Sequence, residues 1–158
     1  MQFMVEDDEI YGIMMSEVIY MDSLKRFLDA QEEMYDVALR EIINGEKVSH
    51  WMWYIFPQLR GLGHSAMSFL YGIDGLDEAK AYLAHPILSA RLIEISEALL
   101  MHPNTLIENL IGDIDVDKLQ SSMTLFATLS ENNSVFHRVL DCFYDGKVDN
   151  QTLQMLGK

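Results

Sequence analysis

The stretch "PILSARLIEISEALLMH", residues 86–102, carries the clearest helical pattern of the chain. Its apolar residues recur every three or four positions and therefore share one face of a helix: Leu88, Leu92, Ile95 and Leu99. Pro86 stands in the first turn, where a missing amide hydrogen costs nothing, and Pro103 ends the pattern. The stretch predicts an amphipathic helix.

The same helical period continues on both sides of this stretch. Polar residues that can cap helix starts separate the periodic segments: Asp22 or Ser23, Ser65, Thr105, Asp115 or Asp117, Ser134 and Asp149. The segments show neither a sustained alternation of apolar and polar residues nor an internal repeat. We therefore predict an all-α fold, a compact single-domain array of about seven helices.

One short segment breaks this uniform picture. Residues 51–56, "WMWYIF", are aromatic and β-branched, which suits a short buried extended segment as well as a helix, and six residues are too few to show a period. A single strand without a pairing partner would leave its backbone groups unsatisfied. We therefore favour a helix or an extended loop here.

The first residues differ in texture from the rest of the chain. Residues 1–21 are acidic and rich in methionine, contain no Lys or Arg, and carry no clear helix start signal. We predict that they form an N-terminal extension and that residues 22–158 form the helical domain. Because methionines adapt to irregular surfaces, this extension also suits contact with a protein partner.

Composition narrows the classes of function. The formal net charge of −14 disfavours a nucleic-acid partner, because the basic residues are not clustered to offset it. No apolar run is long enough to span a membrane, and the N-terminus lacks the basic region of a secretory signal. A single cysteine excludes an internal disulfide. We therefore expect a cytoplasmic protein, with no cofactor and, from the spacing of its histidines, no metal site.

The segment "HWMWYIFPQLRG", residues 50–61, concentrates groups that are costly to bury. Its candidate ligand-binding residues are His50, Trp51, Trp53, Gln58 and Arg60. Flat aromatic faces beside a histidine, an amide and a guanidinium suit a planar, anionic ligand such as a nucleotide. His50 is the candidate proton-transferring group. The alternative interpretation is that the tryptophans anchor the core and the polar residues cap helix ends.

Two further clusters could complete such a site. Gly63 and Ser65 precede a predicted helix, whose free amides and dipole favour an anion. Lys118, Ser121 and Ser122 stand near the start of another helix, before a dense apolar run. A buried serine hydroxyl there either bonds a carbonyl one turn back or lines a cavity.

The blocks "HWMWYIFPQLRGLGHS" (50–65), "EAKAYLAHPILSARL" (78–92) and "DKLQSSMTLF" (117–126), with shorter ones at both ends, give the chain a resemblance to a known family. The chain resembles a bacterial family known as domain of unknown function 1810, whose members often carry the label calpastatin, over roughly residues 22–157. This resemblance implies a small, mostly helical cytoplasmic domain and assigns no reaction.

The sequence therefore leaves three functional hypotheses, and whether the protein is an enzyme stays open among them. The first, which we prefer, is a pocket for an anionic or nucleotide-like small molecule. The second is a non-enzymatic module for protein–protein interaction. The third follows from a fainter resemblance to helical N-glycosidase-like domains and implies hydrolysis of an ADP-ribose-type linkage, with no catalytic residue assigned.

Overall fold

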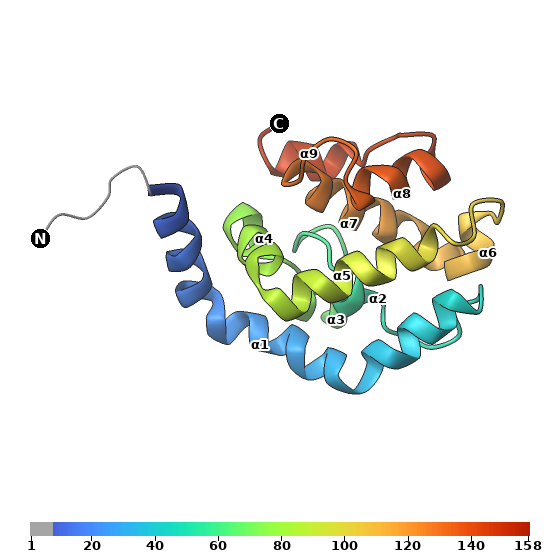
Figure 1. The fold of residues 1–158 in the computed structure, drawn as a ribbon, viewed down its shortest axis with the longest axis horizontal. Coiled ribbons are helices and arrows are strands. Elements are labelled where there is room, and N and C mark those ends of the chain that lie inside the picture. Colours follow the sequence, from blue (N-terminus) through green and yellow to red (C-terminus); the bar gives the residue numbers. More distant parts are fainter. Residues whose placement is uncertain (1–7) are drawn as a thin grey trace, which may run out of the picture.

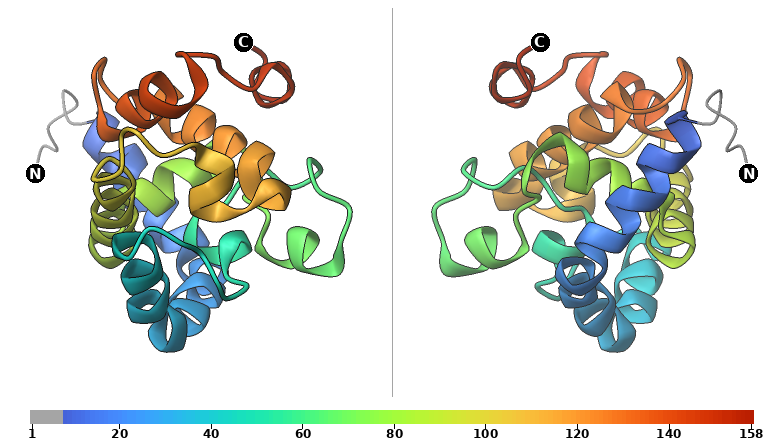
Figure 2. Two further views of the ribbon diagram at one scale, coloured as in Figure 1. Left: turned by 90° about the vertical axis from the view of Figure 1, so that its right-hand side faces the viewer. Right: turned by 90° about the vertical axis from the view of Figure 1, so that its left-hand side faces the viewer.

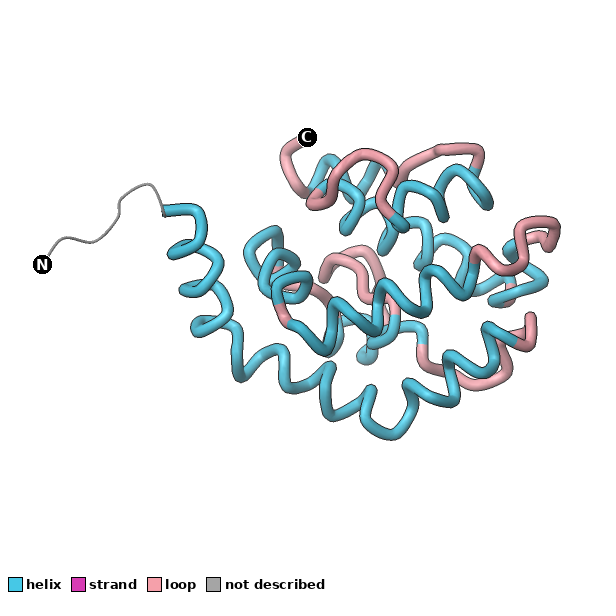
Figure 3. The backbone as a smooth tube through the Cα atoms, viewed as in Figure 1, coloured by secondary structure: helices cyan, strands magenta, loops and turns pink. Residues whose placement is uncertain are grey.

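The computed structural model describes the backbone of residues 8–158 and the side chains of residues 19–158. These residues form nine α-helices and a 3-10 turn. Figure 3 shows that helices and loops make up this part of the chain, with no strand. The elements are α1 (Asp8–Ile43), α2 (Met52–Ile55), α3 (Ala66–Tyr71), α4 (Gly75–Ala84), α5 (Pro86–Leu99), α6 (Ile107–Ile111), the 3-10 turn η2 (Asp113–Asp115), α7 (Val116–Thr128), α8 (Val135–Tyr144) and α9 (Asn150–Met155).

The prediction of an all-α fold is confirmed, but the described part of the chain has more helices than the seven or so expected. The difference arises from one-turn helices such as α2, whose four residues are too few to leave a periodic pattern. Within the described residues, no helix is both long enough and apolar enough to cross a membrane.

Helix α1 forms the floor of the molecule. Figure 1 shows that it curves beneath α4, α5 and α2, and it packs against all three. Its buried residues repeat every three or four positions: Leu24, Phe27, Gln31, Tyr35, Ala38 and Ile42. The helix start that we expected at Asp22 or Ser23 is wrong, because α1 runs on continuously from Asp8. The Ser23 hydroxyl instead donates to the Glu78 carboxylate at 2.6 Å.

Helix α5 lies above α1 and confirms the prediction for residues 86–102 in its position and its inward face. Its predicted apolar face is buried: Leu88, Leu92, Ile95 and Leu99. Pro86 occupies the first turn, and the His85 ring caps the helix by accepting from the amides of Ile87 and Leu88. The helix starts where the sequence predicts because proline needs no amide partner there.

Several of the predicted caps are observed. The hydroxyls of Ser65 and Ser134 and the carboxylate of Asp149 each accept a backbone amide at the start of α3, α8 and α9. The cap expected at Thr105 is wrong, because α6 begins later and Leu106 at its start supplies no side-chain bond. Burial of Ile107 and Leu110 positions this helix in place of local capping.

The extended segment that we considered for residues 51–56 lies elsewhere. Residues 52–55 form the one-turn helix α2, and within residues 8–158 the chain pairs as an extended backbone only at Leu59, which forms an isolated parallel bridge with Ile73. The Arg60 amide donates to the Ile73 carbonyl at 2.9 Å, and the Ile73 amide donates to the Gln58 carbonyl at 2.8 Å. This bridge satisfies the backbone groups that a lone strand would leave open.

The domain boundary at residue 22 stays a prediction. The first seven residues of the expected N-terminal extension lie outside the described part of the chain, as do the side chains of residues 8–18. The backbone of residues 8–21 belongs to the same helix as the residues that follow it.

Candidate functional site

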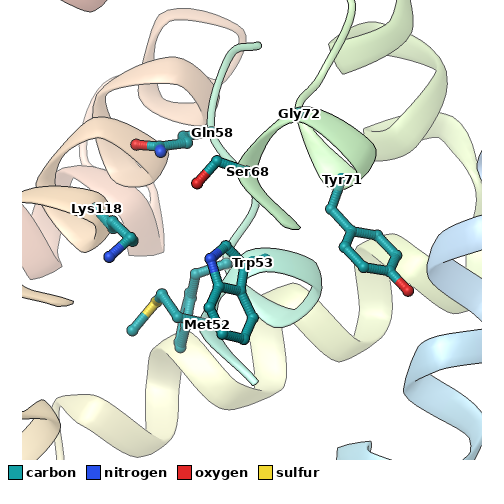
Figure 4. A pocket seen from close by; sticks show the side chains of 8 residues that line it. Met52, Trp53, Gln58, Ser68, Tyr71, Gly72 and Lys118 are labelled. Carbon is teal, nitrogen blue, oxygen red and sulfur yellow. The ribbon is translucent and has the colours of Figure 1, made fainter. Parts of the chain in front are cut away.

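A hollow lies between α2, α3 and the start of α7 (Figure 4). It contains about 220 Å³ of space, part of which is open to solvent. The residues that line it are Met52, Trp53, Phe56, Gln58, Ser68, Tyr71, Gly72 and Lys118. Three of the predicted site residues, Trp53, Gln58 and Lys118, therefore meet at one place although they belong to two distant segments.

The two tryptophans have different surroundings. Trp51 is fully buried, its indole N–H donates to Glu41 Oε1 at 3.0 Å, and the Lys47 ammonium lies 4.9 Å from the centre of its ring. Trp53 is only partly buried, and Figure 4 shows its ring at the wall of the hollow. Trp51 thus anchors the core, as the alternative interpretation expected, and Trp53 is the indole available to a ligand.

Glu41 holds the segment before α2 against the end of α1. It accepts hydrogen bonds from the Ser49 hydroxyl, the amides of Ser49 and Val48, and the Trp51 indole. Burial acts to raise the pKa of Glu41, but these hydrogen bonds outweigh it and lower the pKa to about 2. The Glu41 carboxylate therefore stays charged at neutral pH. Its hydrogen bonds hold the segment before α2 in place.

Lys118 brings a positive charge to the hollow. Its ammonium forms two long contacts of 3.4 Å, one with Asp115 Oδ1 and one with the Ile114 carbonyl. The other oxygen of Asp115 pairs with the Lys47 ammonium at 2.9 Å. Two ammonium groups thus share one carboxylate.

Two glycines allow the backbone to pass close to the hollow. A Cβ atom on Gly72 would lie 2.6 Å from both Cα and Cβ of Arg60, and one on Gly63 would lie 2.4 Å from the Ser68 hydroxyl oxygen and 3.3 Å from Gln58 Nε2. Neither position has room for a larger residue. The predicted role of Gly63 as an anion contact is untested; in the structure it lets Ser68 and Gln58 come together.

Two polar side chains at the hollow have hydrogen-bond donors that no described residue accepts. The Ser65 hydroxyl donates to Ser68 Oγ at 3.0 Å, which leaves the Ser68 proton free to donate to another group. Among the described residues, none forms a hydrogen bond with the side-chain amide of Gln58 at the wall. The hydroxyl of Ser68 and the amide of Gln58 both lie on the side of the hollow that faces Lys118 (Figure 4).

His50, Arg60 and Ser65 are also predicted site residues that do not line the hollow. His50, the candidate proton-transferring group, is exposed on the loop before α2. Arg60 donates to the Phe69 carbonyl at 3.0 Å and lies 3.7 Å from Asp74, so it caps the end of α3. Ser65 is exposed, and its oxygen accepts the Ser68 amide. The amide that we expected to be free for an anion is therefore already bonded.

The paired serines of α7 are both buried but differ in their bonding. The Ser121 hydroxyl donates to Asp149 Oδ2 at 3.1 Å and ties α7 to the start of α9. The Ser122 hydroxyl is the one buried side-chain polar atom in the described residues that has no partner. Neither serine lines the hollow, so only Lys118 of this cluster does.

The hollow also contains residues that the sequence did not single out. Met52, Phe56, Ser68, Tyr71 and Gly72 line it, and the pattern of residues 66–73 indicated only an ordinary helix. The one signal that could have found them is the pair of glycines that flank this helix, because such glycines often mark close backbone approach.

A second, larger hollow of about 410 Å³ lies between α7, α8 and the loop before α9. His137 and Asp141 line it with the side chains of α7, and the His137 ring bonds the Ser134 hydroxyl at 2.8 Å. In the part of the chain that the structure describes, no three His, Cys, Asp or Glu side chains come close enough to hold a metal ion.

Comparison with known proteins places the chain among uncharacterised relatives. The crystal structure of the conserved hypothetical protein Rv1873 from Mycobacterium tuberculosis is similar, with a TM-score of 0.83 and 43% identity over 85% of this chain and 96% of that chain. A search among curated proteins gives no match. A family model described as a protein of unknown function, DUF1810, matches residues 21–156. The resemblance noted in the sequence is thus confirmed, and the chain belongs to the DUF1810 family.

Proposed function

We propose that the hollow between α2, α3 and α7 binds a small anionic molecule, and that the protein acts through this binding. The observation that carries the proposal is the meeting of Trp53, Gln58 and Lys118 at one hollow. Lys118 supplies the charge, Gln58 and Ser68 supply neutral donors, and Trp53 supplies a flat apolar wall. Convergent polar groups on a mostly apolar surface are the usual composition of a small-molecule site.

The charge balance beside the hollow favours an anion over a cation. Asp115 is shared, and Lys47 binds it at 2.9 Å, whereas Lys118 contacts it at 3.4 Å. The Lys118 ammonium therefore has donor capacity left for a ligand. The overall charge of −14 opposes an anion at long range, but at physiological salt such fields are screened beyond about 8 Å. The nearby ammonium therefore decides the preference.

The size of the hollow limits the ligand. The interior of the hollow has a volume of about 10 Å³, which holds about one water molecule, and the figure of about 220 Å³ also counts space that is open to solvent. The hollow therefore does not enclose a ligand: an anionic group can contact its lining residues from the open side, and the rest of the molecule would lie outside it. The nucleotide-like ligand expected from sequence is therefore retained only for its anionic group and one ring, stacked on Trp53.

The lining residues favour binding over hydrolysis. The described walls of the hollow contain no carboxylate and no histidine, and His50 lies outside it. Hydrolysis of a glycosidic linkage uses a group that can move a proton near the bond that breaks. We therefore propose a binding site without assigning a reaction, and the N-glycosidase hypothesis has no residue at this hollow to support it.

Calorimetric titration of the protein with phosphate, pyrophosphate and AMP tests this proposal. We expect pyrophosphate or AMP to bind, and Lys118→Met to weaken binding at least about tenfold, the cost of losing one charged hydrogen bond. Lys80→Met is the matched control, because it removes an equal charge from the exposed face of α4 and should leave affinity unchanged.

Two further variants separate the parts of the site. Trp53→Ala should weaken AMP more than pyrophosphate, since only AMP has a ring to stack. His50→Ala should change neither, because His50 lies outside the hollow. If none of the three anions binds the wild type, or if Lys80→Met weakens binding as much as Lys118→Met, this function is wrong.

A further inference from the structure

We propose that the second hollow, between α7, α8 and the loop before α9, binds a small alkylamine through its ammonium group. Helix α7 packs against both α8 and α9, which lie on its outer side (Figure 2). This hollow shares no lining residue with the hollow of the proposed anion site. The two sites can therefore be tested separately.

The second hollow is large enough to enclose a small organic molecule. Its interior has a volume of about 140 Å³, and the figure of about 410 Å³ also counts space that is open to solvent. A protein cavity of about 150 Å³ can hold benzene, so a ligand of roughly six non-hydrogen atoms fits. Ala127 and Leu140 are buried and line the hollow, so they provide apolar walls for a short carbon chain.

The charge at this hollow favours a cation. Asp141 lines the hollow and is exposed, whereas no Lys or Arg belongs to the described lining. Among the described residues, none forms an ion pair or a hydrogen bond with the Asp141 carboxylate. Arg138, on the same helix, is paired with Glu97 at 2.5 Å. The Asp141 oxygens can therefore accept charge-assisted hydrogen bonds from a ligand, which are the stronger kind.

Two other lining residues can accept further hydrogens of an ammonium group. The Thr128 hydroxyl donates its proton to the Leu125 carbonyl at 2.7 Å, so its oxygen still has a lone pair for a ligand. Nδ1 of His137 bonds the Ser134 hydroxyl at 2.8 Å, which orients the ring. When Nδ1 carries the ring proton, Nε2 is an acceptor. An ammonium group has only donors, so it complements this lining.

The loop that closes the hollow is held in place by bonds within the protein. The Asp149 amide donates to the Thr124 hydroxyl at 2.9 Å, which ties the end of the loop to α7. Gly146 has a φ of +74°, and a Cβ there would lie 3.1 Å from Asp141 Oδ1. The glycine thus leaves space for the carboxylate beside the backbone. A site that is already formed loses less entropy when a ligand binds.

The same residues do not favour a metal ion. His137 and Asp141 lie one turn apart on α8, which suits two ligands of one metal. A zinc site usually takes roughly three or four protein ligands. Within residues that the structure describes, no third His, Cys, Asp or Glu joins this pair. An organic ammonium ion is therefore the cation that the hollow suits better.

An NMR titration with n-butylammonium chloride at neutral pH tests the proposal. We expect saturable shifts of the amides in residues 124–128, 137–141 and 146–148. The dissociation constant should be on the order of 1 mM, from one charged hydrogen bond and a short buried carbon chain. n-Butanol lacks the charge and should bind at least about tenfold more weakly. The absence of saturable shifts at these residues would overturn the proposal, as would equal binding of n-butanol.

Asp141→Asn tests the carboxylate with little change in shape. We expect it to weaken n-butylammonium binding at least about tenfold, the cost of losing one charged hydrogen bond. Asp145→Asn is the matched control, because it removes the same charge nearby from an exposed residue that does not line the hollow. Equal weakening by the two variants would overturn the proposal, since the cation would then respond only to general charge.

Two more titrations identify the source of the ammonium group and test the metal alternative. Nα-acetyl-lysine methylamide carries the same alkylammonium on a blocked peptide. Its binding with equal affinity indicates a lysine side chain of another protein, and weaker binding indicates a free amine. Zinc chloride that binds at His137 and Asp141 more tightly than n-butylammonium would assign the hollow to a metal ion and overturn the proposal.

Discussion

The surroundings of Trp51 and of Trp53 differ more than their places in the sequence suggest. The polar groups that contact Trp51 have partners: the indole bonds Glu41, Glu41 accepts further bonds from Ser49 and Val48, and Lys47 pairs with Asp115. We call Trp51, Glu41 and Lys47 the Trp51 anchor. Around Trp53, the amide of Gln58 and the ammonium of Lys118 retain donors.

The contrast between the two regions indicates which property marks a binding region. Both regions contain an indole and a lysine, so residue type does not separate them. The degree of hydrogen-bond satisfaction does, because a buried group that already has its partners gains nothing from a ligand. The comparison predicts that the Trp51 anchor serves stability and that the Trp53 side serves binding, and four measurements test it.

Truncation of the two tryptophans should give the largest contrast. Trp51→Ala removes a fully buried ring and leaves Glu41 without one donor, so we expect a loss of about 3–5 kcal/mol in the free energy of unfolding. Trp53→Ala removes a partly exposed ring and should cost only about 1–2 kcal/mol. Urea denaturation of both variants measures this, and equal losses would erase the distinction.

The second-largest contrast in stability is expected between Lys47 and Lys118, which both contact Asp115. The Lys47 side chain is 7% exposed and the Lys118 side chain 24%. Lys47→Met removes the closer partner of a buried carboxylate and should lower the free energy of unfolding by about 2 kcal/mol. Lys118→Met should change it by less than about 0.5 kcal/mol while weakening anion binding. A larger stability loss for Lys118→Met than for Lys47→Met contradicts this view.

The Trp51 anchor should make the free energy of unfolding depend on pH through Glu41. Because the folded pKa of Glu41 is about 2 and its ordinary value is 4.5, its stabilisation is present above about pH 5 and lost as the pH falls toward 2. Glu41→Gln should therefore cost about 1–2 kcal/mol at pH 7 and progressively less at lower pH. Denaturation at pH 7, 4 and 3 checks this, with Glu33→Gln on the exposed face of α1 as the control. A constant cost from pH 7 to pH 3 would exclude the titration of Glu41 as its cause.

Substitution of the adjacent serines of α7 should change the free energy of unfolding least, and in opposite directions. Ser121→Ala loses the bond to Asp149 and should cost about 1 kcal/mol. Ser122→Ala removes a buried hydroxyl without a partner, so the free energy of unfolding should stay constant or rise by up to about 1 kcal/mol. A clear loss of stability for Ser122→Ala would show that its hydroxyl has a partner in solution.

Some parts of the fold were predictable because their causes are local. The inward face of α5, its start at Pro86 and the caps at Ser65, Ser134 and Asp149 depend on residues within one turn of each other. The start of α6 could not be predicted in this way. Thr105 offered a local cap, but the burial of Ile107 and Leu110 placed the helix start after it.

The candidate site was predictable only in part, and for a related reason. The sequence marked Trp53, Gln58 and Lys118 because such groups are costly to bury, but the same criterion also marked Trp51 and Arg60, which have partners within the protein. It missed Ser68 and Gly72, whose helix has no unusual composition. Partners at long range satisfy some polar groups and not others, and no local pattern records which.

The helical fold and the membership of the DUF1810 family could be inferred from the amino-acid sequence alone, because helical periods, caps and family motifs depend on neighbouring residues. Three features became visible only in the folded chain: Lys118 meets Trp53 and Gln58 at one hollow, the Trp51 indole bonds Glu41, and Leu59 and Ile73 pair at the two ends of residues 60–72. These outcomes depend on which distant segments pack together, and burial then decides which polar groups keep a free donor.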